Sequence, residues 1–355
     1  TKGLSLKALV NFKNWSETSY TRSIKSNIYK VKDGSYNPET GEYDYQLLQT
    51  GDQFLSQSGI GRNSDQTFYF DARLDWKRSF GDHNLTAMAM YMMREYRSDV
   101  LPNRNQGYSG RVTYDYASKY LVEFNFGYNG SERLAAGHRF EFFPAVSAGW
   151  VASSENFWEP ISKYINHFKI RGSYGLVGSD AFASGAPHFL YQNNIGIGSA
   201  HNFWTGLPTS EISKKGPGFY VLAVQDAGWE HVKKFDIGFD MMLFNQLNIT
   251  FDYFHDKRER ILMSRASWPS MLGYWGSKPW SNIGEVENQG FELSLNWTKQ
   301  FGKDLTLDLR GNFTYNQNEY KYVDEPSYPY VWQTNTGKPL NTVKGYIAEG
   351  LFTSE

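Results

Sequence analysis

Apolar and polar residues alternate along most of this chain. Successive side chains of an extended strand point to opposite sides of a sheet, so strict alternation predicts strands with one apolar and one polar face. The apolar rows lie within residues 4–12, 68–76, 85–93, 112–116, 120–128, 146–150, 168–176, 235–243, 247–253, 291–297 and 305–315. Charged and small polar residues fill the positions between them, as at Asp71, Arg73 and Asp75. The pattern therefore predicts an all-β chain.

Two features of these rows favour a transmembrane wall over a soluble β-sandwich, which would also alternate. About 10 residues, at ~3.3 Å per residue and a tilt of ~40°, rise ~25 Å, which matches the apolar band of an outer-membrane barrel. Tyr and Trp lie at the ends of rows, for example Trp76, Tyr120, Trp150 and Trp297, whereas aliphatic residues and Phe fill the middles. Aromatic girdles at both membrane interfaces require this arrangement.

The connections between the rows alternate between long and short. Long ones lie at about 14–66, 95–107, 130–140, 178–233, 257–286 and 316–345. Short ones lie at 78–83, 117–119, 245–246 and 299–303, with one of medium length at 152–166. Outer-membrane barrels place short turns on the periplasmic side and long loops outside the cell. The alternation therefore indicates a transmembrane antiparallel β-barrel, with about twelve strands here when a last one near residues 346–352 is counted.

Composition excludes several other classes of protein. Aromatic residues make up 17% of the 355 residues and the mean hydropathy is −0.58, but no apolar run approaches the roughly 20 residues of a spanning helix. The formal net charge of −1 and the lack of a basic block predict no nucleic-acid partner. The sequence contains no Cys, which excludes disulfides and thiol nucleophiles.

Several runs on the strands and turns resemble a known family of barrels. They are FGDHN at 80–84, QGYSGRVTYDY at 106–116, FPAVSAGW at 143–150, KIRGSYG at 169–175, KFDIG at 234–238 and NIGEVENQGFE at 282–292. In this order they resemble the barrel of the SusC and RagA type of TonB-dependent transporters from Bacteroidetes. The resemblance extends over nearly the whole chain.

This resemblance implies a 22-stranded barrel in the cell outer membrane, in contact with its lipid and filled by an N-terminal plug. It further implies energy supplied by TonB, a SusD-like surface lipoprotein as partner, and import of oligosaccharides or oligopeptides. Because the chain starts and stops within the pattern and lacks a signal peptide, we interpret residues 1–355 as one partial barrel domain. The plug, the TonB-contacting segment and the last strands are then absent from it.

The residues expected to contact substrate are aromatic residues in two long connections. Flat aromatic faces stack on sugar rings, and large aromatics also serve protein interfaces, so packing of the loops or docking of the lipoprotein is the alternative. The candidates are Trp268, Tyr274, Trp275, Trp280, Phe203 and Trp204.

Charged residues on the polar rows are expected to face the lumen, where they either line the substrate route or pair with one another. They are Arg73, Asp75, Arg171, Asp236 and Arg310. The seven His residues show no metal-ligand spacing, and no Ser/His/Asp order stands out, so we expect no metal, no cofactor and no catalytic residues. A non-transporting surface protein and an outer-membrane enzyme remain the alternative functions.

Overall fold

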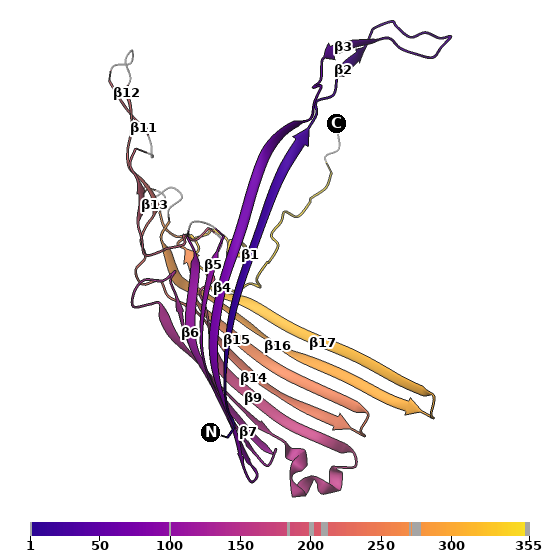
Figure 1. Ribbon diagram of the computed structural model, residues 1–355, viewed down its shortest axis with the longest axis vertical. Helices are drawn as coiled ribbons and strands as arrows, with labels where there is room; N and C mark the ends of the chain where they lie inside the picture. Colours follow the sequence, from indigo (N-terminus) through magenta and orange to yellow (C-terminus); the bar gives the residue numbers. More distant parts are fainter. Residues whose placement is uncertain are drawn as a thin grey trace. The chain divides into compact units, whose positions relative to one another are not determined.

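The protein is described by a computed structural model over residues 2–98, 101–182, 185–198, 202–206, 212–269, 271 and 278–351. Strands dominate this part of the chain, and its helices are short 3₁₀ segments (Figure 1). None of the described helices has the length and apolar character needed to cross a lipid bilayer.

Eleven strands form one sheet in the order β1-β4-β5-β6-β7-β8-β9-β14-β15-β16-β17. Their bounds are β1 (Leu4–Ser23), β4 (Ser56–Phe80), β5 (His83–Arg97), β6 (Asn103–Tyr116), β7 (Tyr120–Ser131), β8 (Phe140–Trp150), β9 (Ile165–Ser179), β14 (Glu230–Leu243), β15 (Leu247–Ser264), β16 (Trp280–Phe301) and β17 (Leu305–Tyr322). Each strand pairs with the next long strand of the chain, which is the meander expected from short and long connections in turn.

Six short strands lie within the long connections and form three separate pairs. They are β2 (Ile28–Val31) with β3 (Tyr45–Gln49), β10 (Asn194–Gly196) with β13 (Gly218–Val221), and β11 (Asn202–Thr205) with β12 (Ile212–Lys215). The 3₁₀ segments are η1 (Ala152–Ser154), η2 (Asn156–Ile161) and η4 (Val331–Gln333).

The chain divides into two compact units. The larger comprises residues 1–9, 70–94 and 104–355, and the smaller comprises residues 10–69 and 95–103. The smaller unit holds the outer parts of β1 and β4 and the β2–β3 hairpin, whose base is tied by a bond from the Lys25 backbone N–H to Asp52. All sites described below lie in the larger unit.

The register of the sheet puts the predicted apolar rows on one face. Tyr120 on β7 is opposite Trp150 on β8, and Phe124 is opposite Val146. Phenylalanine rings from five neighbouring strands follow one another across this face at centroid distances of 5.6–6.1 Å. They belong to Phe168, Phe239, Phe251, Phe291 and Phe313.

Much of this apolar face is uncovered by protein. Val122, Val146 and Ile237 keep 45–49% of their surface exposed, although each lies in the middle of a paired strand. A contiguous exposed apolar surface of this kind marks contact with membrane or protein, because water would disfavour it strongly. The alternation of the sequence thus reflects one face for lipid and one for a polar interior.

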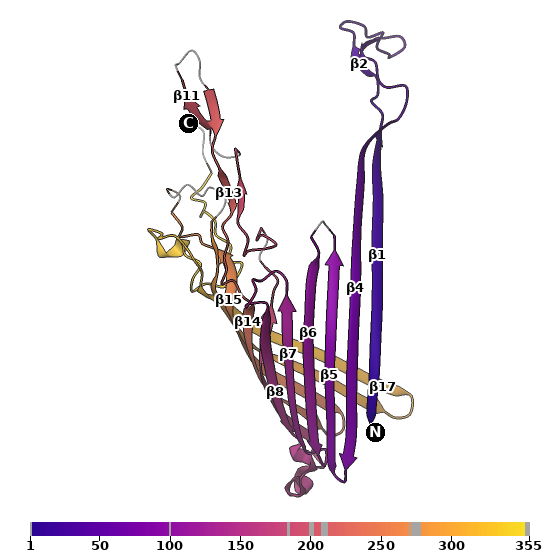
Figure 2. The same cartoon turned by 60° about the vertical axis from the view of Figure 1, so that its left-hand side comes forward.

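The predicted short turns are confirmed, whereas the connection predicted to be long between β5 and β6 spans only residues 98–102. Short turns join β4 to β5, β6 to β7, β14 to β15 and β16 to β17, and η1 and η2 fill the medium connection between β8 and β9. In Figure 1 the turns that follow β14 and β16 lie at one end of these strands, and Figure 2 shows η1 and η2 at the short-turn end of β8.

Two expectations about strand limits were wrong. Residues 346–351 do not form the twelfth strand, because no described segment exchanges backbone hydrogen bonds with them and Tyr346 and Ile347 are almost fully exposed. Several strands also continue past their apolar rows: β15, for example, runs through its charged residues 257–260 to Ser264. The ladder needs only backbone partners, so it extends beyond the apolar band that the sequence pattern marks.

The packed core lies at the loop end of the sheet. Leu134, Leu190 and Leu262 are completely buried, and Phe143 and Trp229 contact them with about 5–7% of their surface exposed. These residues come from β8, from β15, from the connection between β7 and β8 and from the connection between β9 and β14. The long connections are therefore anchored to the sheet by burial of apolar side chains.

Candidate functional site

The polar face of the sheet is organised around Arg171 on β9. Its guanidinium nitrogens lie 2.7 Å from a carboxylate oxygen of Asp252, 3.3 Å from Asp240 and 3.4 Å from Asp236. Arg171 is opposite Gly238 on β14, which in turn is opposite Asp252 on β15. A Cβ atom at Gly238 would overlap with the Asp252 carboxylate, so the glycine opens the path by which arginine reaches two strands away.

One arginine and three aspartates give this cluster a net formal charge of −2. The four side chains keep between 17% and 35% of their surface exposed, so water screens their interactions. The cluster holds its charges side by side on the polar face. The cluster therefore forms part of a water-exposed lining with fixed charges, and not a set of ion pairs buried away from water.

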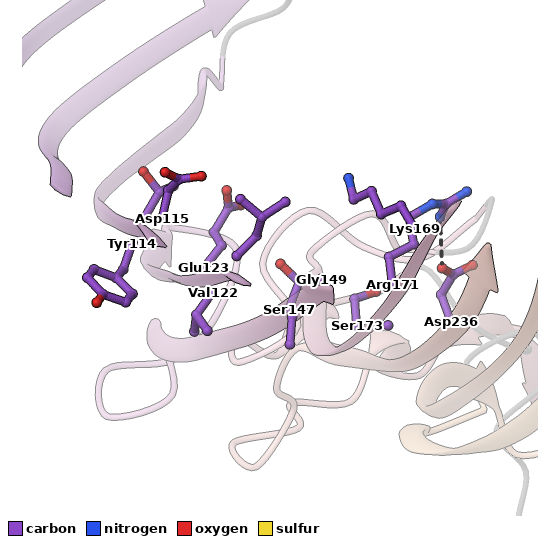
Figure 3. A pocket seen from close by; sticks show the side chains of 14 residues that line it. Tyr114, Asp115, Val122, Glu123, Ser147, Gly149, Lys169, Arg171, Ser173 and Asp236 are labelled. Atoms are coloured by element: carbon purple, nitrogen blue, oxygen red, sulfur yellow. Dashed lines mark hydrogen bonds and ion pairs between the residues drawn. The ribbon is translucent and has the colours of Figure 1, made fainter. Parts of the chain in front are cut away.

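A hollow of about 460 Å³ lies over β6 to β9 and reaches β14, with Arg171 and Asp236 of the cluster in its lining. Figure 3 shows Asp115, Glu123 and Arg171 on one side of the sheet and Tyr114 and Val122 on the other. The alternation predicted from the sequence is therefore visible in the side chains themselves.

Small residues make the floor of the hollow. Ser147 and Gly149 on β8 lie opposite Ser173 and Arg171 on β9, so little side-chain volume projects from β8. A Cβ atom at Gly149 would come to 3.3 Å from the Lys169 side chain. The floor of the hollow is open over β8 because that strand places its bulky residues, Val146 and Trp150, on the opposite face.

Charged residues on the rim of the hollow differ in whether they are paired. Arg111 on β6 forms an ion pair with Glu123 on β7, and Asn125 donates a bond of 2.7 Å to the same carboxylate. Asp115 accepts a bond of 2.9 Å from the Asn84 side chain. Lys169 forms no ion pair with any described residue, so its ammonium is available to a solute.

Each predicted lumen residue lies on the polar face, and most are paired. Arg73 and Asp75 on β4 bond to each other at 2.7 Å. Arg171 and Asp236 belong to the cluster described above. Arg310 lies exposed on β17, opposite Asn296 on β16.

The predicted aromatic candidates lie apart from one another. Trp280 begins β16 and packs against the buried core, whereas Trp204 on β11 is 63% exposed. The backbone of Phe203 pairs with Lys214, and Trp268 is half-buried, its backbone N–H bonded to the carbonyl of Arg265. Tyr274 and Trp275 lie outside the described residues.

The sequence pattern did not predict the role of one carboxylate at the loop end. Glu230, at the start of β14, is 2% exposed and forms an ion pair with Arg258 on β15. It also accepts a bond of 3.3 Å from the backbone N–H of Leu262. A buried carboxylate persists only when paired, so Glu230 fixes the join between the long connection and the sheet.

Asn282 makes a second such join. Its side-chain amide bonds to the backbone N–H and carbonyl of Gly228 and to the carbonyl of Arg260. Arg260 has a φ of +56° within β15, where the register with β16 is interrupted by a bulge. Asn282 opens the NIGEVENQGFE motif, so the motif was the available signal for this position.

The loop after β17 is tied down by Asp324, which is 6% exposed. Burial opposes its ionisation, but bonds from the backbone N–H and hydroxyl of Ser267 and the Arg265 guanidinium outweigh burial, and the pKa of Asp324 lies below its usual value. The neighbouring Glu325 accepts backbone N–H groups of Asn335 and Thr336. Two ionised carboxylates thus hold this loop at neutral pH.

At the short-turn end one carboxylate collects several donors. Glu155, between η1 and η2, accepts bonds from the Tyr120 hydroxyl at 2.7 Å, from Lys119 at 3.2 Å and from the Trp150 ring nitrogen at 3.4 Å. The Tyr120 bond is the main cause of the lowered pKa of Glu155. Among the described residues, no group of three or more His, Asp or Glu side chains could hold a metal ion.

The sequence of this chain is similar to one known protein family and to several proteins of that kind. The profile of the family described as "TonB dependent receptor-like, beta-barrel" matches residues 4–353. TonB-dependent receptor P3 of Formosa agariphila is 32% identical over 304 residues, 75% of this chain and 29% of the relative. TonB-dependent receptor SusC of Bacteroides thetaiotaomicron is 25% identical over 324 residues, 87% of this chain and 28% of the relative.

A solved structure also has this fold. The RagAB peptide importer in its "open-open" state superposes with a TM-score of 0.66 over 91% of this chain and 35% of the matched chain, at 20% sequence identity. The chain spans between 24% and 29% of the length of three curated relatives.

Proposed function

Because the chain belongs to the family of TonB-dependent receptor-like β-barrels, we propose that it forms part of the wall of an energy-coupled importer of oligosaccharides or oligopeptides. The chain is part of a protein of the outer membrane of a bacterium. TonB would act through a segment that is not in this chain. The work of these residues is to separate lipid from a polar passage.

The observation that carries this proposal is the contrast between the two faces of the sheet. One face bears exposed apolar side chains such as Ile237, and the other bears the Arg171 cluster and the hollow beside it. A soluble enzyme or adhesin gains nothing from exposing one face to this extent. A wall with lipid outside and a hydrated passage inside requires it.

Within the passage, charges held in pairs favour transit over tight binding. A solute that passes the Arg171 cluster meets a lining already neutralised in part, and unpaired Lys169 supplies one point of attraction. We propose Arg73, Asp75, Arg171, Asp236 and Arg310 as lumen residues along this route.

At the loop end we propose that the aromatic candidates contact the arriving substrate. Trp280 lies next to the buried core, which fixes its ring, and Trp204 extends into solvent. Phe203, Trp268, Tyr274 and Trp275 complete the set as predictions from the sequence. Lining the passage and contacting the substrate need no catalytic group. We therefore propose that this protein captures and passes its substrate and breaks no bond in it.

We propose a SusD-like surface lipoprotein as partner at this loop end. One relative is named SusC, and another match is to the RagAB importer. The long connections, anchored by Leu134, Leu190 and Leu262, would give a lipoprotein a firm surface on which to dock. We further propose that residues 1–355 belong to a single barrel domain.

Purification of the tagged, full-length protein from its native outer membrane tests the proposal. We expect a lipoprotein of SusD type to co-purify in a fixed ratio, identified by mass spectrometry. Cells should import a labelled oligosaccharide or oligopeptide only while the inner membrane is energised, with a protonophore as control. A protein that purifies alone and conducts ions openly in a planar bilayer would contradict the proposal.

A further inference from the structure

A second, smaller hollow lies at the loop end, apart from the Arg171 cluster. It has a volume of about 290 Å³, just below the roughly 300 to 1,000 Å³ typical of small-molecule sites. Its wall comes from the end of β15, the start of β16 and two segments of the connection between β9 and β14. The lining residues are Gly185, Pro187, Tyr220, Val221, Leu222, Ser264, Lys278 and Trp280.

Two aromatic residues give the hollow flat apolar surfaces. Trp280 also packs against the buried core, so its ring is held from behind. Tyr220 is 53% exposed at the end of β13. Ser264 is opposite Trp280 in the β15–β16 register and adds a hydroxyl beside the ring. Such a combination suits a ring with apolar faces and hydroxyl edges.

Among the described lining residues, Lys278 carries the only charge, and it is positive. Lys278 donates one bond of 3.1 Å to the carbonyl of Ala266, which leaves two of its three ammonium donors for other partners. It forms no ion pair with the described residues, and no carboxylate lines the hollow. Lys278 is therefore a local centre of positive potential in the hollow.

The walls of the hollow are fixed before any ligand arrives. The segment bearing Pro187 is anchored by Ala186 and Leu190, and the segment after Leu222 is anchored by Val224, all packed in or against the buried core. The backbone N–H of Val224 also bonds to the carbonyl of Leu190 at 2.7 Å. Because the walls are held, binding would cost little ordering of the loops.

We propose that this hollow is a subsite for one acidic sugar residue of an imported oligosaccharide. The aromatic side chains take the face of the sugar ring, and Lys278 pairs with its carboxylate or sulfate. An acidic amino-acid side chain could form an ion pair with Lys278, but it has no ring that could stack on Tyr220 and Trp280. The inference rests on the proposed import function and names its class of substrate.

Binding to the full-length protein in detergent, measured by titration calorimetry, tests this subsite. The probes are tetra-galacturonate, its fully methyl-esterified form, a sulfated carrageenan tetrasaccharide and tetra-glutamate. The ester keeps the rings and removes the charge. We expect tetra-galacturonate to bind about tenfold more tightly than its ester, since a charge-assisted hydrogen bond is lost. Tight binding of the sulfated probe alone would identify sulfate as the acidic group.

The variants separate charge from ring. Lys278→Met should remove the preference for the acid over the ester, Lys278→Arg should keep most of it, and Tyr220→Ala should weaken both sugars. Lys214→Met, an exposed lysine on β12 outside the hollow, is the matched control. Tyr220 is exposed, so its variant remains informative if a change at Lys278 disturbs folding.

Equal affinity for the acid and the ester together with no tight binding of the sulfated probe would overturn the subsite while leaving the importer in place. A preference for an acidic probe that survives in Lys278→Met would overturn it as well. Tetra-glutamate that binds as tightly as tetra-galacturonate would overturn the assignment to a sugar. If the cells import neither sugars nor peptides through this protein, the proposed function falls together with the subsite.

Discussion

Residues 117–119 close the hairpin between β6 and β7, whereas residues 180–229 join β9 to β14 at the opposite end of the sheet. The first connection depends on backbone geometry, with Ala117 and Ser118 at φ of +51° and +58°. The second depends on burial, with Leu190 fully enclosed. The sheet between them has no packed interior, because its two faces serve lipid and a polar passage.

This difference teaches where stability resides in such a wall. Between the two ends, apolar side chains meet lipid and the backbone ladder carries the structure. Only the loop end, surrounded by water, can gain from a conventional hydrophobic core. Substitutions should therefore act through different mechanisms and with different magnitudes at the two ends and on the polar face.

The largest effect is expected from Leu190→Ala in the core of the loop end. Loss of a fully buried leucine side chain and the cavity left behind should cost about 3 kcal/mol. Hydrogen–deuterium exchange should show faster exchange in residues 185–198 and 222–229, with the turns unchanged. Ile195→Ala, at a half-exposed position of the same connection, is the control. Equal exchange in the two variants would show that the core does not anchor the connection.

A smaller effect is expected from Arg171→Met on the polar face, which leaves three aspartates without their common cation. Because all four groups are partly exposed, we expect a loss of about 1 to 2 kcal/mol, measured by thermal unfolding in detergent. The loss should shrink in 1 M salt, which screens the repulsion. Arg310→Met, on the same face, should leave the transition unchanged. A similar loss of stability in Arg310→Met would mean that the total charge of the polar face, and not the arrangement of the cluster, determines the stability.

Asp324→Asn sharpens the comparison through pH. The folded-state pKa of Asp324 lies below its usual value of 3.8, so its contribution is complete above about that pH and is lost as the pH falls through the folded-state pKa. At pH 7 the variant should therefore be less stable locally by about 1 kcal/mol, seen as faster amide exchange at Ser267. As the pH falls through the folded-state pKa, the two proteins should converge.

Asp226 is exposed, and Asp226→Asn serves as the control for this pH dependence. Its amide exchange at Ser267 should match that of the parent protein at pH 7 and in acid. A gap between parent and Asp324→Asn that persists unchanged in acid would rule out the carboxylate as its source. At the other end of the sheet, Glu155 also has a lowered pKa. Its contribution to the turn should therefore be lost in the same direction, as the pH falls.

The smallest effect, and the only gain, is expected from Ala117→Gly. Alanine disfavours a positive φ whereas glycine does not, so the variant should be more stable by about 0.5 to 1 kcal/mol. Ala148→Gly in the middle of β8 should be less stable by a similar amount, since glycine weakens a strand. Thermal unfolding of both variants gives the comparison. A loss at both positions would show that the turn does not strain Ala117.

Much of this fold could be predicted from the sequence because alternation and turn lengths are local properties. The alternation placed Arg171 and Asp236 on the polar face. The lengths of the connections indicated which end of the sheet carries the short turns and which the long loops. Alternation could not reveal that Arg171 meets Asp252, because this contact depends on register across three strands and on Gly238. Nor could it find Leu134 or Leu190, which lie in connections without a regular pattern and become buried only through tertiary packing.

The order of the strands has a consequence for how the wall forms. Every long strand pairs with its successor, so most pairings have low contact order and can be added one hairpin after another. The connection of residues 180–229 is the longest between two paired strands of the sheet. Closing it costs about 2.5 kcal/mol more chain entropy than closing residues 117–119. The buried leucines at the loop end offset that cost, so β14 should join the growing sheet only when this cluster condenses.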